Sequence, residues 1–328
     1  MSKKSKNVVD KTDRGSKKKP GKRASTQGEL ATAANDAEVI IDLAHAAEEP
    51  RFAAHLAQIY VDGPLSDVAD LAAVDLLLEE GHVGLDVEAG IATVTLHRPA
   101  QLNAQTDKTW EALAWIGENL DDTVRVVIVK GVGRSFSAGL DREAMPGILE
   151  LIAGETDTQA LERIRSYQKG FSWLADTQFV SIAAVHGHAI GAGFQLALAC
   201  DLVIAATDSQ FAMREITWGM VPDLGGTSRL TQAVGARRAL ELCATGRAVG
   251  AKEAWEIGLV NTVVDTADLS DAVNALAQEL LSRPAEALRA VTRLISTAAS
   301  LTSSDQRLRE RSEQVPLLRE LNKQTESD

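Results

Sequence analysis

The sequence has little of several residue types that would mark its class. Its 328 residues include only two cysteines, Cys200 and Cys243, and both lie in apolar stretches. So few cysteines predict buried, inert thiols and a reduced, cytoplasmic location. Aromatic residues make up only 4% of the chain, so no aromatic pattern indicates the shape of a binding pocket.

No segment is apolar over the length that a membrane span needs. The N-terminal residues also lack the apolar core of a secretory signal. We therefore expect no membrane partner. The 45% of hydrophobic residues instead predicts a sizeable core, in one large domain or in one domain with an appendage.

Charge is unevenly distributed along the chain. The formal net charge is −12, yet the first 23 residues hold ten lysines and arginines against Asp10 and Asp13. An acidic body does not favour a nucleic-acid partner, although a basic leader could bind one. We interpret residues 1–27 as a disordered basic tail. Residues 28–80 are predicted to form a helical extension, and residues 304–328 a charged C-terminal tail that is a surface helix or frayed.

The stretch Ser181–Ala205 reads as a strand, a glycine-rich turn, a helix and a strand. Ile182 to Val185 form a short apolar run of the kind that a buried strand shows. Three glycines interrupt it at positions 187, 191 and 193. From Ala192 to Cys200 the apolar residues suit a helix that is buried nearly all round.

This turn offers a place to hold an oxyanion. A glycine turn that opens a buried helix leaves backbone N–H groups unpaired at a positive dipole end. The missing side chains of Gly191 and Gly193 let a ligand approach that backbone closely. The alternative is that these glycines only permit close packing of the helix on the strand. A dinucleotide site is disfavoured, because Leu196 stands where its fingerprint needs a third glycine.

The surrounding pattern indicates an α/β fold. A β-hairpin is predicted from strands at 83–87 and 91–96, followed by a helix around Trp110. Further strands are expected at 125–129, 202–206 and 259–264. Residues 142–177 are predicted to form irregular helices with a hinge at Pro146-Gly147. This segment could be a mobile lid over a site or an ordinary helical insertion. Later helices are expected at 228–244, 251–257, 267–282 and 284–300.

Taken in order, five motifs resemble the crotonase superfamily, also called the enoyl-CoA hydratase/isomerase family. The likeness covers about residues 82–300, and it is the ordered set that is specific. The matching segments are VTLHRPAQLNA at 94–104, GRSFSAGLD at 133–141, AAVHGHAIGAGFQLALACD at 183–201, FAMREITWGMVPDLGGT at 211–227 and ALELCATGRAVGAKEAWEIGLVNTVV at 239–264.

The resemblance implies a superhelix of strand–strand–helix units with C-terminal helices over residues 81–303, assembled as a homotrimer or a dimer of trimers. It implies an acyl-CoA thioester as the substrate, and no separate cofactor. By position, the backbone N–H groups of Leu140 and Ala192 would form the oxyanion hole. The substrate would also contact Ala138, Gly139 and Gly191. Arg98 would contact the CoA nucleotide or serve only as surface charge.

The resemblance also implies where the proton chemistry lies. Many hydratases of the family use two glutamates on opposite sides of a water molecule. The first position is Gln195 in this sequence, and the second is Glu215. An amide can orient water but cannot exchange a proton at neutral pH. Losing a titrating partner costs about two to four powers of ten in rate, so efficient two-glutamate hydration is not expected.

Asp223 stands eight residues after Glu215, where hydratases of the family often carry glycine. Family members that shift double bonds often have aspartate in this Pro-Asp-x-Gly-Gly setting. Two nearby carboxylates would push one pKa upward, which suits a base and a proton relay. The alternatives are structural: Glu215 could pair with Arg214 or Arg229, and Asp223 could cap the helix after Gly226.

The sequence therefore predicts an enzyme that isomerises an unsaturated acyl-CoA through an enolate. The second reading is hydration of a 2-enoyl-CoA, with Gln195 holding the water. A third is a non-catalytic acyl-CoA- or RNA-binding subunit, which needs no carboxylates at the thioester. His186 and His188 lack a third ligand for a metal. The segment from Gly133 lacks the last glycine of a serine hydrolase elbow.

Overall fold

The computed structural model describes residues 68–327. The predicted basic tail and residues 28–67 of the predicted helical extension lie outside the described residues. Helix α2 (Val68–Gly81) packs against α3 (Asp107–Asn119) and the first strand. Val74 and Leu78 are buried and Leu77 is half-buried, so these apolar residues of the helix pack on the main body of the protein.

The main sheet contains six strands in the spatial order β1-β2-β3-β4-β6-β9. The hairpin of β1 and β2 is antiparallel and turns at Ala89 and Gly90, both with positive φ, as a two-residue hairpin turn of the favoured type requires. The other neighbouring pairs are parallel. The strands are β1 (Val83–Glu88), β2 (Ile91–Leu96), β3 (Val126–Gly131), β4 (Val180–Val185), β6 (Leu202–Ala206) and β9 (Thr262–Val264).

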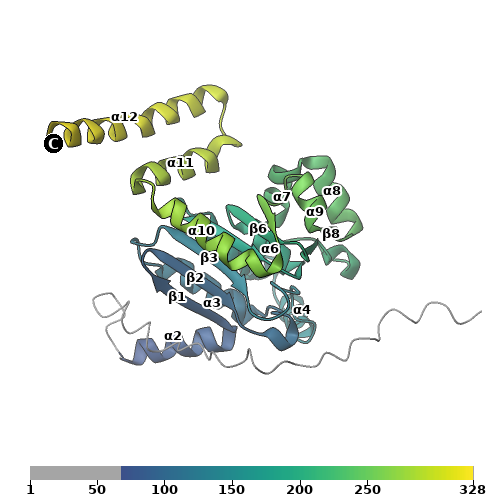
Figure 1. Ribbon diagram of the computed structural model, residues 1–328. Helices are drawn as coiled ribbons and strands as arrows, with labels where there is room; N and C mark the ends of the chain where they lie inside the picture. The colour runs from purple at the N-terminus through teal and green to yellow at the C-terminus, as the bar shows by residue number, and fades with distance from the viewer. Residues whose placement is uncertain (1–67, 328) are drawn as a thin grey trace, which may run out of the picture. The chain divides into compact units, whose positions relative to one another are not determined.

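Helices cover both faces of this sheet (Figure 1). Val127 and Val129 of β3 face the cluster formed with α3 and α6 (Ala192–Ala199). Val126 and Ile128 face α10 (Leu269–Leu281) on the other side. Because both faces are buried, the parallel strands read as continuous apolar runs. Every residue of α6 is buried, which confirms the helix buried all round that its composition predicts.

A second sheet lies beside the glycine-rich turn before α6 and aligns the segments that carry Leu140 and Ala192. Its three strands are β5 (His188–Ile190), β7 (Gln210–Ala212) and β8 (Val249–Gly250). β5 pairs in parallel with β7, and a parallel bridge joins Ser137 to Ala189. The chain before Leu140 and the chain before Ala192 therefore run side by side.

The remaining helices surround this core. The α-helices are α4 (Met145–Ala153), α5 (Asp157–Ser172), α7 (Gly226–Val234), α8 (Ala236–Thr245), α9 (Ala251–Glu256), α11 (Ala285–Ala298) and α12 (Ser303–Ser327). The 3₁₀ turns are η2 (Pro99–Gln101), η3 (Trp173–Ala175), η4 (Glu215–Trp218) and η5 (Thr266–Asp268).

Three local predictions from the sequence were wrong. The helix predicted at 228–244 is two helices, because Gly235 has φ +78° and ψ 156° and breaks the hydrogen-bond ladder. Pro146 is no hinge. It lies in the first turn of α4, where its missing N–H costs nothing, and the break comes at Gly154. The strand predicted at 259–264 covers only Thr262–Val264.

The charged C-terminal segment is helical. It forms α12, which pairs with α11 through an ion pair between Arg293 and Glu313 at 2.7 Å. Of the two predicted alternatives, the structure therefore shows the surface helix. Within residues 68–327 we find no helix with the length and apolar character to cross a bilayer.

Candidate active site

The first backbone donor of the site lies in the turn after β3. Gln105 N donates to Gly139 O at 2.7 Å, and Asp141 N donates to Gln105 O at 2.7 Å. In this parallel bridge the N–H of Leu140 points to the opposite side. It has no acceptor among the described residues. Gly139 has φ +85°, a left-handed conformation that suits glycine.

The second donor opens helix α6. Gly191, with φ +52°, precedes the helix, and its own N–H donates to Ala212 O at 2.8 Å. Ala192 is the first helical residue, so its N–H has no partner within the helix and none elsewhere in residues 68–327. A Cβ added to Gly139 would lie 3.3 Å from Ala192 N. The two predicted oxyanion donors therefore belong to turns in direct contact.

Glu215 lies against this pair of turns. Its carboxylate approaches Gly191 so closely that a Cβ there would lie 3.4 Å from Oε1. Oε1 accepts a hydrogen bond from Gln195 Nε2 at 2.8 Å. Oε2 is buried and has no partner among the described residues. Glu215 forms no ion pair with Arg214 or Arg229 in this part of the chain, so that structural alternative is wrong.

The surroundings of Glu215 favour its protonated form. Burial raises the pKa of its carboxyl above the ordinary value. The hydrogen bond from Gln195 acts in the opposite direction, and the negative charge of Asp223 adds to the rise. The two carboxyl groups predicted to act together are thus close enough to influence each other.

Gln195 is buried, with 1% of its surface exposed. Besides donating to Glu215, it accepts hydrogen bonds at Oε1 from Leu224 N at 2.9 Å and Gly226 N at 3.1 Å. Both lone pairs of its oxygen are therefore in use. The oxygen of Gln195 therefore has no free lone pair for the water molecule that the sequence analysis considered it to hold.

Asp223 precedes α7 but does not cap it. The residue before the helix is Gly225, and no side chain caps that end, so the predicted capping alternative is wrong. The carbonyl oxygen of Asp223 accepts from Gln168 Nε2 of α5 at 2.7 Å. Burial raises the pKa of the Asp223 carboxyl, although one side of the residue remains exposed and in contact with water.

Arg98 lies in an ion pair with Asp141, and the side chains are only 20% and 10% exposed. Burial alone would raise the pKa of Asp141, but the backbone N–H of Glu143 and the Arg98 guanidinium hold it below its usual value. Arg98 is therefore not merely surface charge, and it fixes the residue next to Leu140. Whether it also contacts CoA stays a prediction. Ala138, half-buried, donates its N–H to Leu102 O at 2.8 Å.

A buried polar network under the first turn was not singled out from the sequence. Ser137 Oγ donates to Asn103 O at 2.7 Å and accepts from Gln105 Nε2 at 3.0 Å. Trp110 Nε1 donates to Gln105 Oε1 at 2.8 Å. Polar residues that cluster in the LNAQT segment, next to an apolar helix, are the signal that could have found it.

His186, which follows β4, and His188, the first residue of β5, have separate partners. His186 Nε2 lies 2.9 Å from Gly133 O, and His188 Nδ1 lies 3.1 Å from Ser135 Oγ. No group of three metal-ligating side chains occurs within residues 68–327. Cys243 of α8 is a neighbour of Glu215 that the sequence did not indicate. Burial, with the negative charge of Glu215 adding to it, raises the pKa of the thiol.

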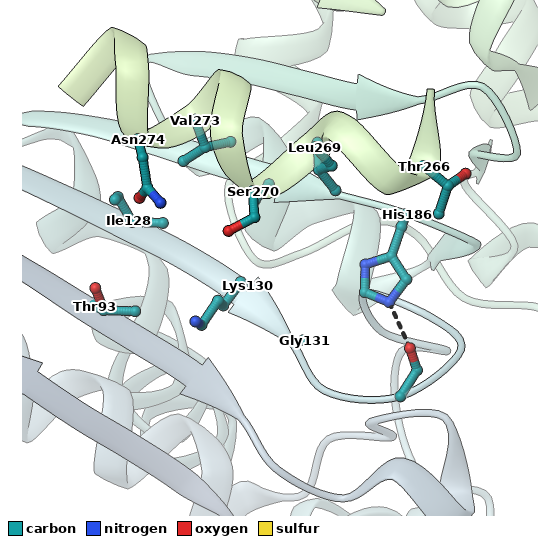
Figure 2. Close-up of a pocket in the computed structure, with 12 residues that line it drawn as sticks. Thr93, Ile128, Lys130, Gly131, His186, Thr266, Leu269, Ser270, Val273 and Asn274 are labelled. Carbon is teal, nitrogen blue, oxygen red and sulfur yellow. Dashed lines mark hydrogen bonds between the residues drawn. The ribbon is translucent and has the colours of Figure 1, made fainter. Parts of the chain in front are cut away.

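A separate recess lies between α10 and strands β2, β3 and β4 (Figure 2). Its volume is about 370 Å³, and Lys130, His186, Ser270 and Asn274 are among its lining residues. No carboxylate lines it, and Leu140, Ala192, Glu215 and Gln195 are not among its lining residues.

Comparison with known proteins gives one consistent family. The model of the enoyl-CoA hydratase/isomerase family matches residues 86–326. A Mycobacterium tuberculosis protein assigned as an enoyl-CoA hydratase is 33% identical over 225 residues, 67% of this chain and 83% of its own. The 1,2-epoxyphenylacetyl-CoA isomerase of Escherichia coli is 35% identical over 225 residues, 67% of this chain and 84% of its own.

Solved structures agree with these sequence matches. A Thermobifida fusca protein assigned as an enoyl-CoA hydratase, in complex with acetoacetyl-CoA, superposes with a TM-score of 0.71 at 41% identity. The match covers 75% of this chain and 98% of that one. A second structure of such a protein from the same organism, in complex with CoA, has a TM-score of 0.70 at 43% identity, over 76% of this chain and 97% of that one.

Proposed function

Because the chain belongs to the enoyl-CoA hydratase/isomerase family, we propose that it moves a double bond within an unsaturated acyl-CoA. One observation carries this proposal. The buried Oε2 of Glu215 has no partner among the described residues and lies beside the turn that presents Ala192 N–H. A single base next to an oxyanion hole is what proton transfer between two carbons requires.

The reaction begins with the thioester oxygen between the N–H groups of Leu140 and Ala192. Glu215 Oε2 removes a proton from a carbon next to the conjugated system, and the electron pair moves onto the thioester oxygen. Each preorganised donor contributes about 3 kcal/mol to stabilising that charge.

The return of the proton completes the isomerisation. The carboxyl group of Glu215, or Asp223 as a relay, delivers a proton to the other carbon, and the carbonyl reforms with the double bond moved. Substrate and product are isomers, so no water is consumed. The raised pKa of Glu215 suits both halves, because the same group must accept and then release a proton near neutral pH.

Hydration of a 2-enoyl-CoA is the second candidate, favoured by relatives assigned as hydratases. The contacts of Gln195 speak against an efficient version. Its oxygen is filled by two backbone N–H groups and its nitrogen donates to Glu215. Water would have to be activated by Glu215 and Asp223 alone.

A non-catalytic binding role is the third reading. Burying Glu215 with an unpaired oxygen disfavours its charged form, and a pure binder has no use for that arrangement. The basic tail that could bind RNA lies outside the described residues. If deletion of residues 1–27 left all binding unchanged, the hypothesis that the basic tail binds RNA would be refuted.

The assembly is proposed to be a homotrimer or a dimer of trimers. Within residues 68–327, helices α11 and α12 expose a set of large apolar side chains that a monomer would leave in water: Val291, Ile295, Leu308, Val315, Leu318 and Leu321.

The deciding experiment is mass spectrometry of 2-enoyl- and 3-enoyl-CoA thioesters incubated with the protein in heavy water. We expect movement of the double bond, with or without deuterium on carbon, and its loss in Glu215→Gln. The matched control is Glu310→Gln, an exposed glutamate of α12. Addition of one whole heavy water would favour the hydratase. Intact, unlabelled thioesters throughout the panel would contradict both enzymatic proposals for these substrates.

A further inference from the structure

The side chain of Gln195 joins three groups of the proposed site. It donates to Glu215 Oε1 at 2.8 Å and accepts from Leu224 N at 2.9 Å and Gly226 N at 3.1 Å. These two N–H groups stand on either side of Gly225, in the loop that follows Asp223. One amide therefore links helix α6, the start of η4 and the start of α7.

The loop is shaped around this amide. A Cβ on Gly226 would lie 2.6 Å from Gln195 Cγ and 3.0 Å from its Oε1, so only glycine allows this approach. Gly225 has φ +92°. The close packing and the two short hydrogen bonds hold the loop to α6.

An amide makes all three bonds without gaining or losing a proton. Backbone N–H groups can only donate, and an ionised carboxylate can only accept. An ionised glutamate at position 195 would accept from the loop but could not donate to Glu215. An apolar side chain would do neither.

We propose that Gln195 is a positioning residue, which holds Glu215 by Oε1 so that Oε2 carries the proton, and which clamps the loop after Asp223. This rests on the proposed function in one respect, that Glu215 is the base. Gln195 itself neither touches the reacting carbons nor exchanges a proton.

The charges around Glu215 give the inference a measurable consequence. The groups that face its carboxyl are the Gln195 amide from α6, Asp223 from the loop and Cys243 from α8. Burial and Asp223 both raise the pKa of Glu215, whereas the Gln195 hydrogen bond lowers it. Removing that donor must shift the pKa upward.

Two variants separate the two tasks of Gln195. Gln195→Met has a similar length and loses both the donor and the acceptor. Gln195→Glu keeps an oxygen for the loop, but its added negative charge raises the pKa of Glu215 by itself, so this variant reports on the loop alone. The matched control is Gln278→Glu on the exposed side of α10, which makes the same chemical change away from the site.

The titration of Glu215 is read without substrate, from the ¹³C NMR signal of its labelled carboxyl, which is assigned by its absence in Glu215→Gln. Amide hydrogen exchange at Leu224 and Gly226 reads the loop. We expect both Gln195 variants to raise the titration midpoint. Only Gln195→Met should speed exchange at the two amides, on the order of tenfold for one lost hydrogen bond.

An unchanged Glu215 midpoint in a folded Gln195→Met overturns the proposal, as does unchanged exchange at Leu224 and Gly226 in that variant. If the methionine variant fails to fold, Gln195→Leu, which also removes the donor and the acceptor without adding a charge, is measured in the same way. A raised midpoint in a protein that isomerises nothing would leave the positioning role standing and remove the proposed reaction, so the two failures are distinguishable.

Discussion

At the scale of single residues, the site depends on two side chains whose chemistry differs by one group. Gln195 and Glu215 have the same length, but only the second can exchange a proton. The amide makes three hydrogen bonds and the carboxylate keeps one oxygen without a partner. In the proposed reaction, Gln195 therefore positions and Glu215 transfers the proton.

Replacing Glu215 by Gln tests this division through pH. The rate should fall by about two to four powers of ten, because the base is lost. In the parent protein the rate should fall as pH drops through the raised pKa of Glu215, since only the ionised form accepts a proton. A profile of kcat/KM against pH measures both, and a flat acidic side would contradict the assignment of the base.

The same substitution should change stability in a pH-dependent way. A carboxyl whose pKa is higher in the folded state binds its proton more tightly when folded, so its contribution to stability is largest at low pH. That contribution is lost as pH rises from the unfolded value through the folded one. Glu215→Gln should therefore gain Tm relative to the parent as the pH rises from the ordinary pKa of a glutamate through the raised pKa of Glu215, and a constant difference would argue against the raised pKa.

At the scale of elements, the proposed oxyanion hole is a contact between two glycine turns. The turn after β3 is paired with Gln105, and the turn before α6 is paired with Ala212. The Ser137–Ala189 bridge brings the two chains together. The N–H groups of Leu140 and Ala192 stay unpaired while the backbone groups next to them are paired. The positions of these two donors therefore depend on the whole hydrogen-bond pattern.

Gly139→Ala tests the contact between the turns. The added Cβ would lie 2.3 Å from Ile190 O, and φ is +85°. We expect a loss of about 1–3 kcal/mol in the free energy of unfolding and a larger relative loss of activity. Denaturant unfolding and kcat/KM measure the two effects.

Gly147→Ala in α4 is the matched control. A Cβ there meets nothing within 4 Å, so this change should be neutral or stabilising by about 0.5–1 kcal/mol. If Gly139→Ala behaved like its control, the two turns would not be in the contact described.

At the scale of the whole molecule, the exposed apolar side chains of α11 and α12 support the proposed assembly. Leu318→Glu and Ile295→Glu each place a charge where another copy of the chain would bury an apolar group. We expect a shift to smaller species in light scattering after size exclusion. Gln314→Glu, an exposed change on the same helix, should leave the mass unchanged. A monomeric parent protein would refute the proposal of a trimer.

The sequence by itself determined the family and the approximate positions of the six strands of the main sheet, and it predicted roles for Leu140, Ala192, Glu215 and Asp223. These features are local: apolar runs, glycine turns and motif spacing persist in the chain whatever surrounds it. The hairpin that turns at Ala89-Gly90 and the all-buried α6 were predicted for the same reason.

Only the tertiary structure decided how those residues act. Neighbours distant along the chain give Gln195 its three bonds, leave Oε2 of Glu215 unpartnered, place Arg98 on Asp141 and deny Asp223 a capping role. Hydrogen-bond partners and burial depend on which segments pack together, and the pKa of a carboxyl depends on both. No pattern within one segment contains that information.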